Sequence, residues 1–206
     1  MKIINKEKLL DFLPSKETIE KIEKTFNEYK KLNFNDEQLD QIYEGICYDL
    51  DVSIYAKPEY SLEQMEQIKL GLLDGVDISW YADSNFDETQ MEQIRYGLKK
   101  GLDVSKYASP EFNYWQMQEI RKGLENNLDI SKYADRKYNW WQMKEIRLGL
   151  EQNLDVSIYA NKNFDENQME QIRYGLENGL DITKYADIEF NWYQMQEIRL
   201  EMEKNK

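Results

Sequence analysis

The chain has no histidine and one cysteine, Cys47, among its 206 residues. The missing histidine excludes Ser-His-Asp and Cys-His catalysis and removes the commonest metal ligand. A single cysteine permits no intramolecular disulfide and no thiolate zinc site within one chain, and we interpret it as a free thiol. No GxxxxGK[ST] or GxGxxG motif occurs. We therefore expect no enzyme activity, no cofactor and no metal site.

The chain also lacks long apolar runs and an excess of positive charge. No stretch approaches the ~18 apolar residues of a membrane span, and residues 1–17 lack the apolar core of a signal peptide. We expect a cytoplasmic protein without membrane contact. Lys and Arg number 27 against 40 Asp and Glu, a net charge of −13. This balance disfavours direct nucleic-acid binding and suits a partner with a basic surface, although solubility alone also explains it.

One unit of 26 residues recurs through most of the chain. A glutamine marks its register at Gln38, Gln64, Gln90, Gln116, Gln142, Gln168 and Gln194. A fixed period in this range is typical of solenoids. We predict an all-α fold, an α-solenoid of long-helix/short-helix repeats. Residues 34–206 form the repeat domain, six full repeats plus a truncated seventh, and residues 1–33 form an N-terminal helical cap. In the cap, Leu9, Leu10, Phe12 and Leu13 are expected to pack on the first repeat.

The unit from Phe164 to Glu189 shows how each repeat is expected to fold. Asp165 is an N-cap, and Gln168 completes a capping box. Apolar residues at helical spacing follow, until Gly179 permits the left-handed conformation that ends helices. Asp181 then caps a second, very short helix. Capping explains this recurrent aspartate more simply than calcium binding.

A glycine stands in the middle of the predicted long helix in six units, at Gly45, Gly71, Gly97, Gly123, Gly149 and Gly175. A mid-helix glycine costs roughly 1 kcal/mol relative to alanine. We interpret the column as a place where another backbone approaches closely. The last unit has Glu201 in this position.

A basic column runs through the same helices at Lys69, Arg95, Arg121, Arg147, Arg173 and Arg199. Carboxylates lie three or four residues away from most of its members. Such spacing predicts a ladder of surface or inter-repeat salt bridges. The alternative is a row of arginines that binds an anionic ligand.

The units differ most in the two positions after each N-cap, where three of them carry aromatic pairs: Tyr114 and Trp115, Trp140 and Trp141, Trp192 and Tyr193. Helical geometry turns the first member toward a neighbouring unit and the second away from the core. Leu148 and Leu200 follow on the same outward side, and Trp80 lies in a short helix. Exposed aromatic patches usually mark binding sites. These nine residues are the candidate partner- or ligand-binding surface.

The motif QMEQIRYGLENGLDITKYA, at residues 168–186 and in related forms across 34–206, resembles repeat tracts of phage and mobile-element proteins from low-GC Gram-positive bacteria. The resemblance implies no assigned activity; it suggests a role in phage–host conflict. Our first hypothesis is a non-enzymatic protein-binding scaffold, an acidic inhibitor of host machinery. The alternatives are a small-molecule or nucleotide sponge using the aromatics and helix N-termini, and a self-assembling structural element, so a homo-oligomer is also possible.

Overall fold

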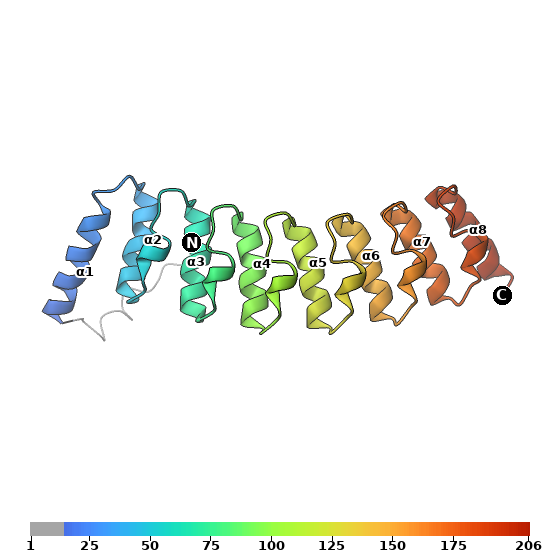
Figure 1. The fold of residues 1–206 in the computed structure, drawn as a ribbon, viewed down its shortest axis with the longest axis horizontal. Coiled ribbons are helices and arrows are strands. Elements are labelled where there is room, and N and C mark those ends of the chain that lie inside the picture. Colours follow the sequence, from blue (N-terminus) through green and yellow to red (C-terminus); the bar gives the residue numbers. More distant parts are fainter. Residues whose placement is uncertain (1–14) are drawn as a thin grey trace. The chain divides into compact units, whose positions relative to one another are not determined.

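The computed structural model describes residues 15–206, which are mainly helical (Figure 1). The chain forms two compact units, Met1–Ile78 and Ser79–Lys206, and each is described by itself. In the first unit the described elements are α1 (Lys16–Tyr29), α2 (Asp36–Cys47), the 3-10 turn η2 (Val52–Ile54) and α3 (Leu62–Asp74). Helix α1 packs on α2, and α2 packs on α3.

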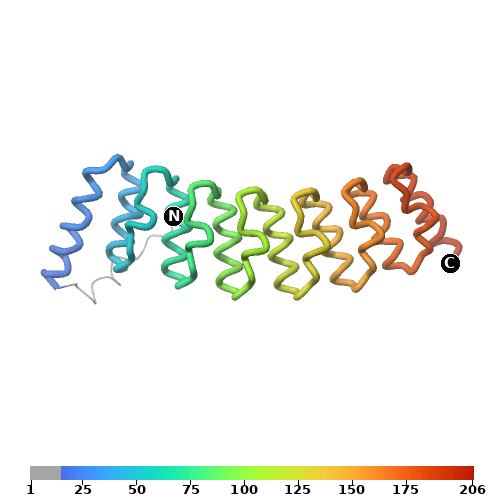
Figure 2. Tube along the Cα trace, viewed as in Figure 1, coloured from blue at the N-terminus to red at the C-terminus, as the bar shows by residue number. Residues whose placement is uncertain are grey.

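The second unit continues the pattern after the turn η3 (Ile78–Trp80), which crosses the boundary between the units. Its long helices are α4 (Glu88–Lys99), α5 (Tyr114–Glu125), α6 (Trp140–Glu151), α7 (Glu166–Glu177) and α8 (Trp192–Lys204). The turns between them are η4 (Val104–Lys106), η5 (Ile130–Lys132), η6 (Val156–Ile158) and η7 (Ile182–Lys184). Within this unit each long helix, from α4 to α8, packs against the next, and Figure 2 shows their order along the chain. The predicted all-α fold with consecutive, solenoid-like packing is confirmed.

The start of each repeat helix is closed by the predicted capping box. In α5, Gln116 N donates to Asn113 Oδ1 and Asn113 N donates to Gln116 Oε1, both at 3.0 Å. The same reciprocal pair occurs at the start of α2, α3, α4, α6, α7 and α8. Helix ends follow the prediction as well, since Gly101 and Asn127 have positive φ. Local sequence therefore defines both ends of the repeat helix.

The short helices are three-residue 3-10 turns capped by the aspartate column. Asp129 Oδ1 accepts hydrogen bonds from Ser131 N at 3.2 Å and from Ser131 Oγ at 2.5 Å. These bonds, the side-chain bond foremost, lower the pKa of the Asp129 carboxyl. The predicted capping role is confirmed.

The glycine column makes room for a tyrosine of the same repeat. Tyr107 is fully buried, and its Oη donates to the carbonyl of Gln93 at 3.2 Å. A Cβ added at Gly97 would lie 1.9 Å from that Oη. A Cβ would meet the tyrosine Oη of its own repeat in the same way at Gly45, Gly123, Gly149 and Gly175. Our interpretation that a second backbone approaches here is wrong. The 3-10 turn folds back on its own long helix, so a side chain fills the gap.

The N-terminal region is described only from Ser15 onward. Ser15 caps α1, whose Phe26 ring meets Tyr43 of α2 edge-on at 5.0 Å. Leu9, Leu10, Phe12 and Leu13 lie outside the described residues, and the division into a cap, 1–33, and a repeat domain, 34–206, stays a prediction. Within residues 15–206, no helix is both long and apolar enough to cross a membrane.

Candidate functional site

In the repeats of α2, α4, α5, α6 and α7, the register glutamine binds the next repeat in addition to capping its own helix. Gln116 Nε2 donates to the carbonyl of Tyr138 at 2.8 Å, and Gln142 Nε2 donates to that of Phe164 at 2.7 Å. Gln38, Gln90 and Gln168 make the same bond to Tyr60, Phe112 and Phe190. Because these carbonyls directly precede the next N-cap, the bond links the first turns of neighbouring long helices. Residues in those turns are thereby placed side by side.

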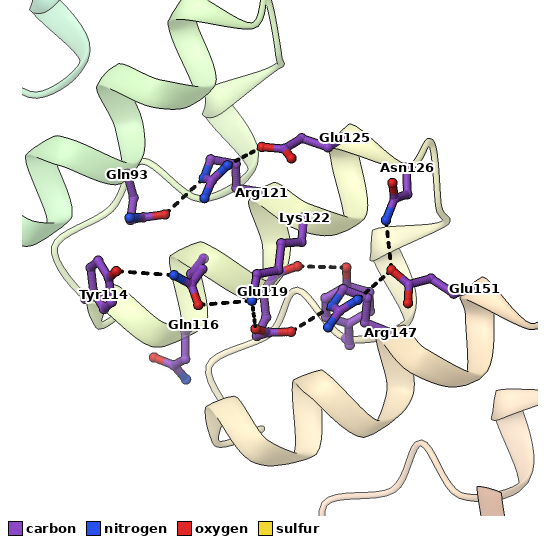
Figure 3. Close-up of polar contacts among 12 residues, drawn as sticks. Gln93, Tyr114, Gln116, Glu119, Arg121, Lys122, Glu125, Asn126, Arg147 and Glu151 are labelled. Carbon is purple, nitrogen blue, oxygen red and sulfur yellow. Dashed lines mark hydrogen bonds and ion pairs between the residues drawn. The ribbon is translucent and has the colours of Figure 1, made fainter.

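The arginine column forms inter-repeat contacts below the surface. Arg147 is buried; its Nε donates to Glu119 Oε2 of the preceding repeat at 2.7 Å, and its Nη1 donates to Glu151 Oε1 at 2.5 Å (Figure 3). Burial alone would lower the pKa of Arg147, but the bonds and charges of Glu119 and Glu151 outweigh it and raise the pKa. The predicted inter-repeat salt bridges are present here and between Arg173 and Glu145.

Glutamine replaces glutamate in other members of this network. Arg121 Nε donates to Gln93 Oε1 at 2.9 Å, and Arg199 Nε donates to Gln171 Oε1 at 3.1 Å. Tyr174 lies beside the row, its ring centroid 4.5 Å from Arg173 Cζ and 5.4 Å from Arg199 Cζ. Arg95, the remaining arginine of the column, is also buried. The row as an anion site stays a prediction, and the contacts of Arg147 and Arg173 with this chain's own carboxylates weigh against it.

Four rings gather over the first turns of α5 and α6, and we call Tyr114, Trp115, Trp140 and Trp141 the aromatic ladder. Tyr114 meets Trp115 edge-on with centroids 4.8 Å apart. Trp115 stacks on Trp140 of the next repeat at 5.2 Å, and Trp140 stacks on Trp141 at 3.7 Å. The ladder is therefore continuous across two repeats.

The two second-position tryptophans of the ladder, Trp115 and Trp141, face solvent. Trp115 is 48% exposed and Trp141 43%, whereas Tyr114 and Trp140 are half-buried. This is the orientation expected from helical geometry, with the first member turned sideways and the second outward. The sequence did not reveal that Trp140 reaches Trp115, or that Lys144 Nζ lies over the Trp141 ring, 5.0 Å from its centroid. The signal for the lysine was its spacing, three residues after Trp141.

The other candidate residues lie apart from the ladder along the chain. Trp192 and Tyr193 form an edge-on pair on α8 with centroids 5.9 Å apart, and both are exposed. Helix α7, with Glu166 and Asn167 in the equivalent positions, comes between them and α6. Trp80 is 41% exposed on η3, Leu200 is exposed on α8, and Leu148 is half-buried on α6. The structure thus joins four of the nine predicted residues into one cluster.

No family model, curated protein or solved structure matches this chain. In residues 15–206, no three His, Cys, Asp or Glu side chains are grouped so that they could hold a metal ion.

Proposed function

We propose that this protein is a non-catalytic binding scaffold and that the aromatic ladder anchors a protein partner. The observation that carries the proposal is a continuous set of four rings over two repeats, with Trp115 and Trp141 nearly half exposed. Tryptophan and tyrosine dominate binding hot spots, where truncation of one ring costs about 2 kcal/mol or more.

Repeats without the ladder support a binding role over a packing role. Helices α4 and α7 carry Glu88–Thr89 and Glu166–Asn167 where α5 and α6 carry ring pairs. Both nevertheless keep the capping box and the glutamine bond to the next repeat. The repeat therefore forms without aromatic first turns. Since repeat packing does not require these large exposed rings, partner binding is the better explanation for them.

The repeat-level resemblance to mobile-element tracts makes host proteins the first place to look for a partner. Inhibition of host machinery remains the role we propose for such a complex. Two alternatives use the same surface: a nucleotide sponge, in which bases stack on the ladder, and self-assembly through it. Direct nucleic-acid binding is not part of the proposal, because the chain carries a net charge of −13.

The test compares three tagged proteins in pull-downs from nuclease-treated host lysate. They are the wild type, a ladder variant with Trp115→Ala and Trp141→Ala, and a control variant with Trp192→Ala and Tyr193→Ala. Both variants remove two exposed rings from first helical turns, so the loss of exposed aromatic area is similar. Circular dichroism confirms that each variant keeps its helices.

A host protein retained by the wild type and the control, and lost with the ladder variant, supports the proposal. Retention by the ladder variant would show that the site assignment is wrong. Nucleotides that stabilise only the wild type in thermal shift would favour the sponge. A dimer that dissociates only in the ladder variant would favour self-assembly.

A further inference from the structure

We infer that the ladder takes an extended peptide segment with acidic and apolar residues at its centre and basic residues on both sides. The inference rests on the proposed function and adds the chemistry of the partner segment. It follows from how charge is distributed over the first turns of α4, α5, α6 and α7, all in the unit Ser79–Lys206.

The caps and first turns of α5 and α6, which hold the ladder, contain no carboxylate. The cap and first turn of α4 contain two, and so do those of α7. Helices α5 and α6 begin with the neutral caps Asn113 and Asn139 and have no acidic residue in the first turn. Helix α4 begins with Asp87 and Glu88, and α7 with Asp165 and Glu166. From α4 to α7, the first turns are thus acidic, neutral, neutral and acidic in order.

The following turn repeats this pattern and adds positive charge. Five residues after the N-cap, α4 has Glu92 and α7 has Glu170, whereas α5 has Gln118 and α6 has Lys144. Lys144 Nζ lies over the Trp141 ring. Lys122 adds a second cation on α5, although Glu119 already pairs with it at 2.8 Å. The surface around the exposed rings therefore combines aromatic side chains with the ammonium of Lys144, and it lies between the acidic first turns of α4 and α7.

The helix N-termini act in the same direction. The positive end of a helix dipole favours a nearby negative charge, and in α4 and α7 the chain's own carboxylates supply it. In α5 no first-turn carboxylate does so, and at α6 the carboxylate comes from the next repeat, where Glu166 Oε2 accepts from the cap Asn139 Nδ2 at 3.3 Å. A partner carboxylate at the ladder is thus attracted by Lys144 and by the α5 dipole, while Lys or Arg side chains of the partner pair with Glu88, Glu92, Glu166 and Glu170. The net charge predicts a basic partner, and this local pattern restricts the basic groups to the two flanks.

The spacing of the repeats fits an extended chain. Packed helices lie about 8–10 Å apart, and an extended chain advances about 3.3 Å per residue. A segment that crosses the first turns therefore meets a new helix every three residues or so. From α4 to α7 it needs about nine residues, with basic groups at the ends and acidic and apolar groups in the middle.

The ladder suits peptide side chains better than stacked nucleobases. Trp140 already stacks on both Trp115 and Trp141, and Lys144 lies over Trp141. Little free ring face is left at Trp140 for a base, whereas ring edges and the exposed parts of Trp115 and Trp141 can contact an apolar side chain. A nucleic acid strand would also carry its phosphates onto the carboxylates of α4 and α7.

Two labelled peptides of identical composition test the inference, RGSEFEGSR and EGSRFRGSE, with blocked termini and measured by fluorescence anisotropy at low salt. Both have zero net charge, so only the order of charges differs. We expect RGSEFEGSR to bind the wild type about tenfold more tightly, because several surface charge pairs change sign between the peptides. Trp115→Ala with Trp141→Ala should abolish binding. Lys144→Glu should remove most of the preference, and Lys184→Glu, the same change on exposed η7, should leave it intact.

The outcomes separate this inference from the proposed function. Equal binding of both peptides, lost in the ladder variant, would overturn the charge pattern and leave the ladder as a protein-binding site. No binding of either peptide at about 1 mM would overturn the extended segment, while the lysate experiment still decides the function. Tighter binding of an oligothymidylate than of either peptide, lost in the ladder variant, would overturn both.

Discussion

The α2–α3 interface in the first unit and the α6–α7 interface in the second use equivalent positions with a different cation. Lys69 of α3 places its ammonium 2.5 Å from Glu44, whose side chain is 43% exposed. Arg173 of α7 instead binds buried Glu145 at 2.8 Å and also pairs with Glu177. Within the described residues, Oε1 of Gln41, the counterpart of Glu145, is buried without a hydrogen-bond partner.

This difference shows what the arginine contributes. A guanidinium has donors on three nitrogens in a fixed plane, so it reaches one acceptor in the preceding repeat and another on its own helix. An ammonium is a single point charge, and at Lys69 it turns to the more exposed glutamate. The same column therefore forms a two-acceptor link with arginine and a one-acceptor link with lysine.

High pH should lower the free energy of unfolding through both interfaces to a similar extent, and this is the largest effect that we expect. Burial raises the pKa of Tyr55 and Tyr159, which occupy equivalent positions in the two units, and it raises the pKa of Tyr185 to about 12. Above about pH 10 an unfolded tyrosine releases its proton while the folded one keeps it, so the unfolded state binds fewer protons. Stability then falls by about 1.4 kcal/mol per pH unit for each such tyrosine.

We expect cooperative loss of helix above about pH 11, measured by circular dichroism together with tyrosinate absorbance. The part of the absorbance change that comes from the buried tyrosines should coincide with the loss of helix, because these side chains ionise only on unfolding. Complete tyrosine titration near pH 10 with the helices intact would contradict the buried hydroxyl–carbonyl bonds.

Removal of the cation should affect the two interfaces unequally. Arg173→Ala leaves Glu145 buried and unpaired and should lower the free energy of unfolding by about 3 kcal/mol, measured with urea. Lys69→Ala should cost under about 1 kcal/mol because Glu44 stays hydrated. Burial already raises the pKa of Glu145, so the loss in Arg173→Ala should shrink at pH 4, where that carboxyl can be protonated.

A second substitution checks the cause of that loss. Glu145→Gln in the Arg173→Ala background removes the unpaired charge and should restore part of the stability, as Gln93 and Gln171 already occupy this column. Equal losses at positions 69 and 173 would contradict the difference between the interfaces.

The register glutamine should matter equally on both sides of the comparison. Gln142→Glu keeps the acceptor of the capping box but loses the donor to Phe164 O, and should cost about 2 kcal/mol. Gln38→Glu, which loses the bond to Tyr60 O, should cost about as much. Gln194→Glu on α8 is the matched control, because exposed Gln194 has only its capping-box bonds among the described residues. Its denaturation midpoint should not fall.

Conversion of the weaker interface into the stronger one has the smallest effect and the opposite sign. Lys69→Arg places an Nε–H opposite Gln41 Oε1, as in the Arg121–Gln93 pair, and Leu73→Glu supplies the acceptor on the same helix. The double variant should gain about 1 kcal/mol. Leu73→Glu alone, which exchanges an exposed leucine, should gain little. A double variant no more stable than the wild type would show that Gln41 finds another partner.

Much of the fold could be predicted because its determinants are local. Caps such as Asn113, helix ends such as Gly101 and the buried Tyr107 each follow from a few neighbouring residues. The prediction for the glycine column was wrong because a glycine shows only that space is needed. Which group fills that space depends on how the 3-10 turn folds back on its own long helix. The recurrence of glutamine where glutamate would also complete a capping box was a usable signal for a donor bond to the next repeat.

The candidate site was predictable in part for the same reason. Helical geometry gives the outward direction of Trp115 and Trp141. The stack of Trp115 on Trp140 depends on how one repeat is offset from the next, which no single repeat encodes. The sequence placed Tyr193 with Trp115 and Trp141 in one discontinuous patch and did not show which rings touch; in the structure Tyr193 contacts Trp192 on α8.

The contact between Trp115 and Trp140 joins residues that belong to different copies of the repeat. Exchanging the copies around α6 and α7 would keep every capping box, tyrosine and glutamine link, yet it would separate the two halves of the ladder. In such an array, duplication or reordering of copies can create or erase a binding surface without any point mutation. Whether the ladder is continuous therefore depends more on the order of the copies than on the sequence of any single copy.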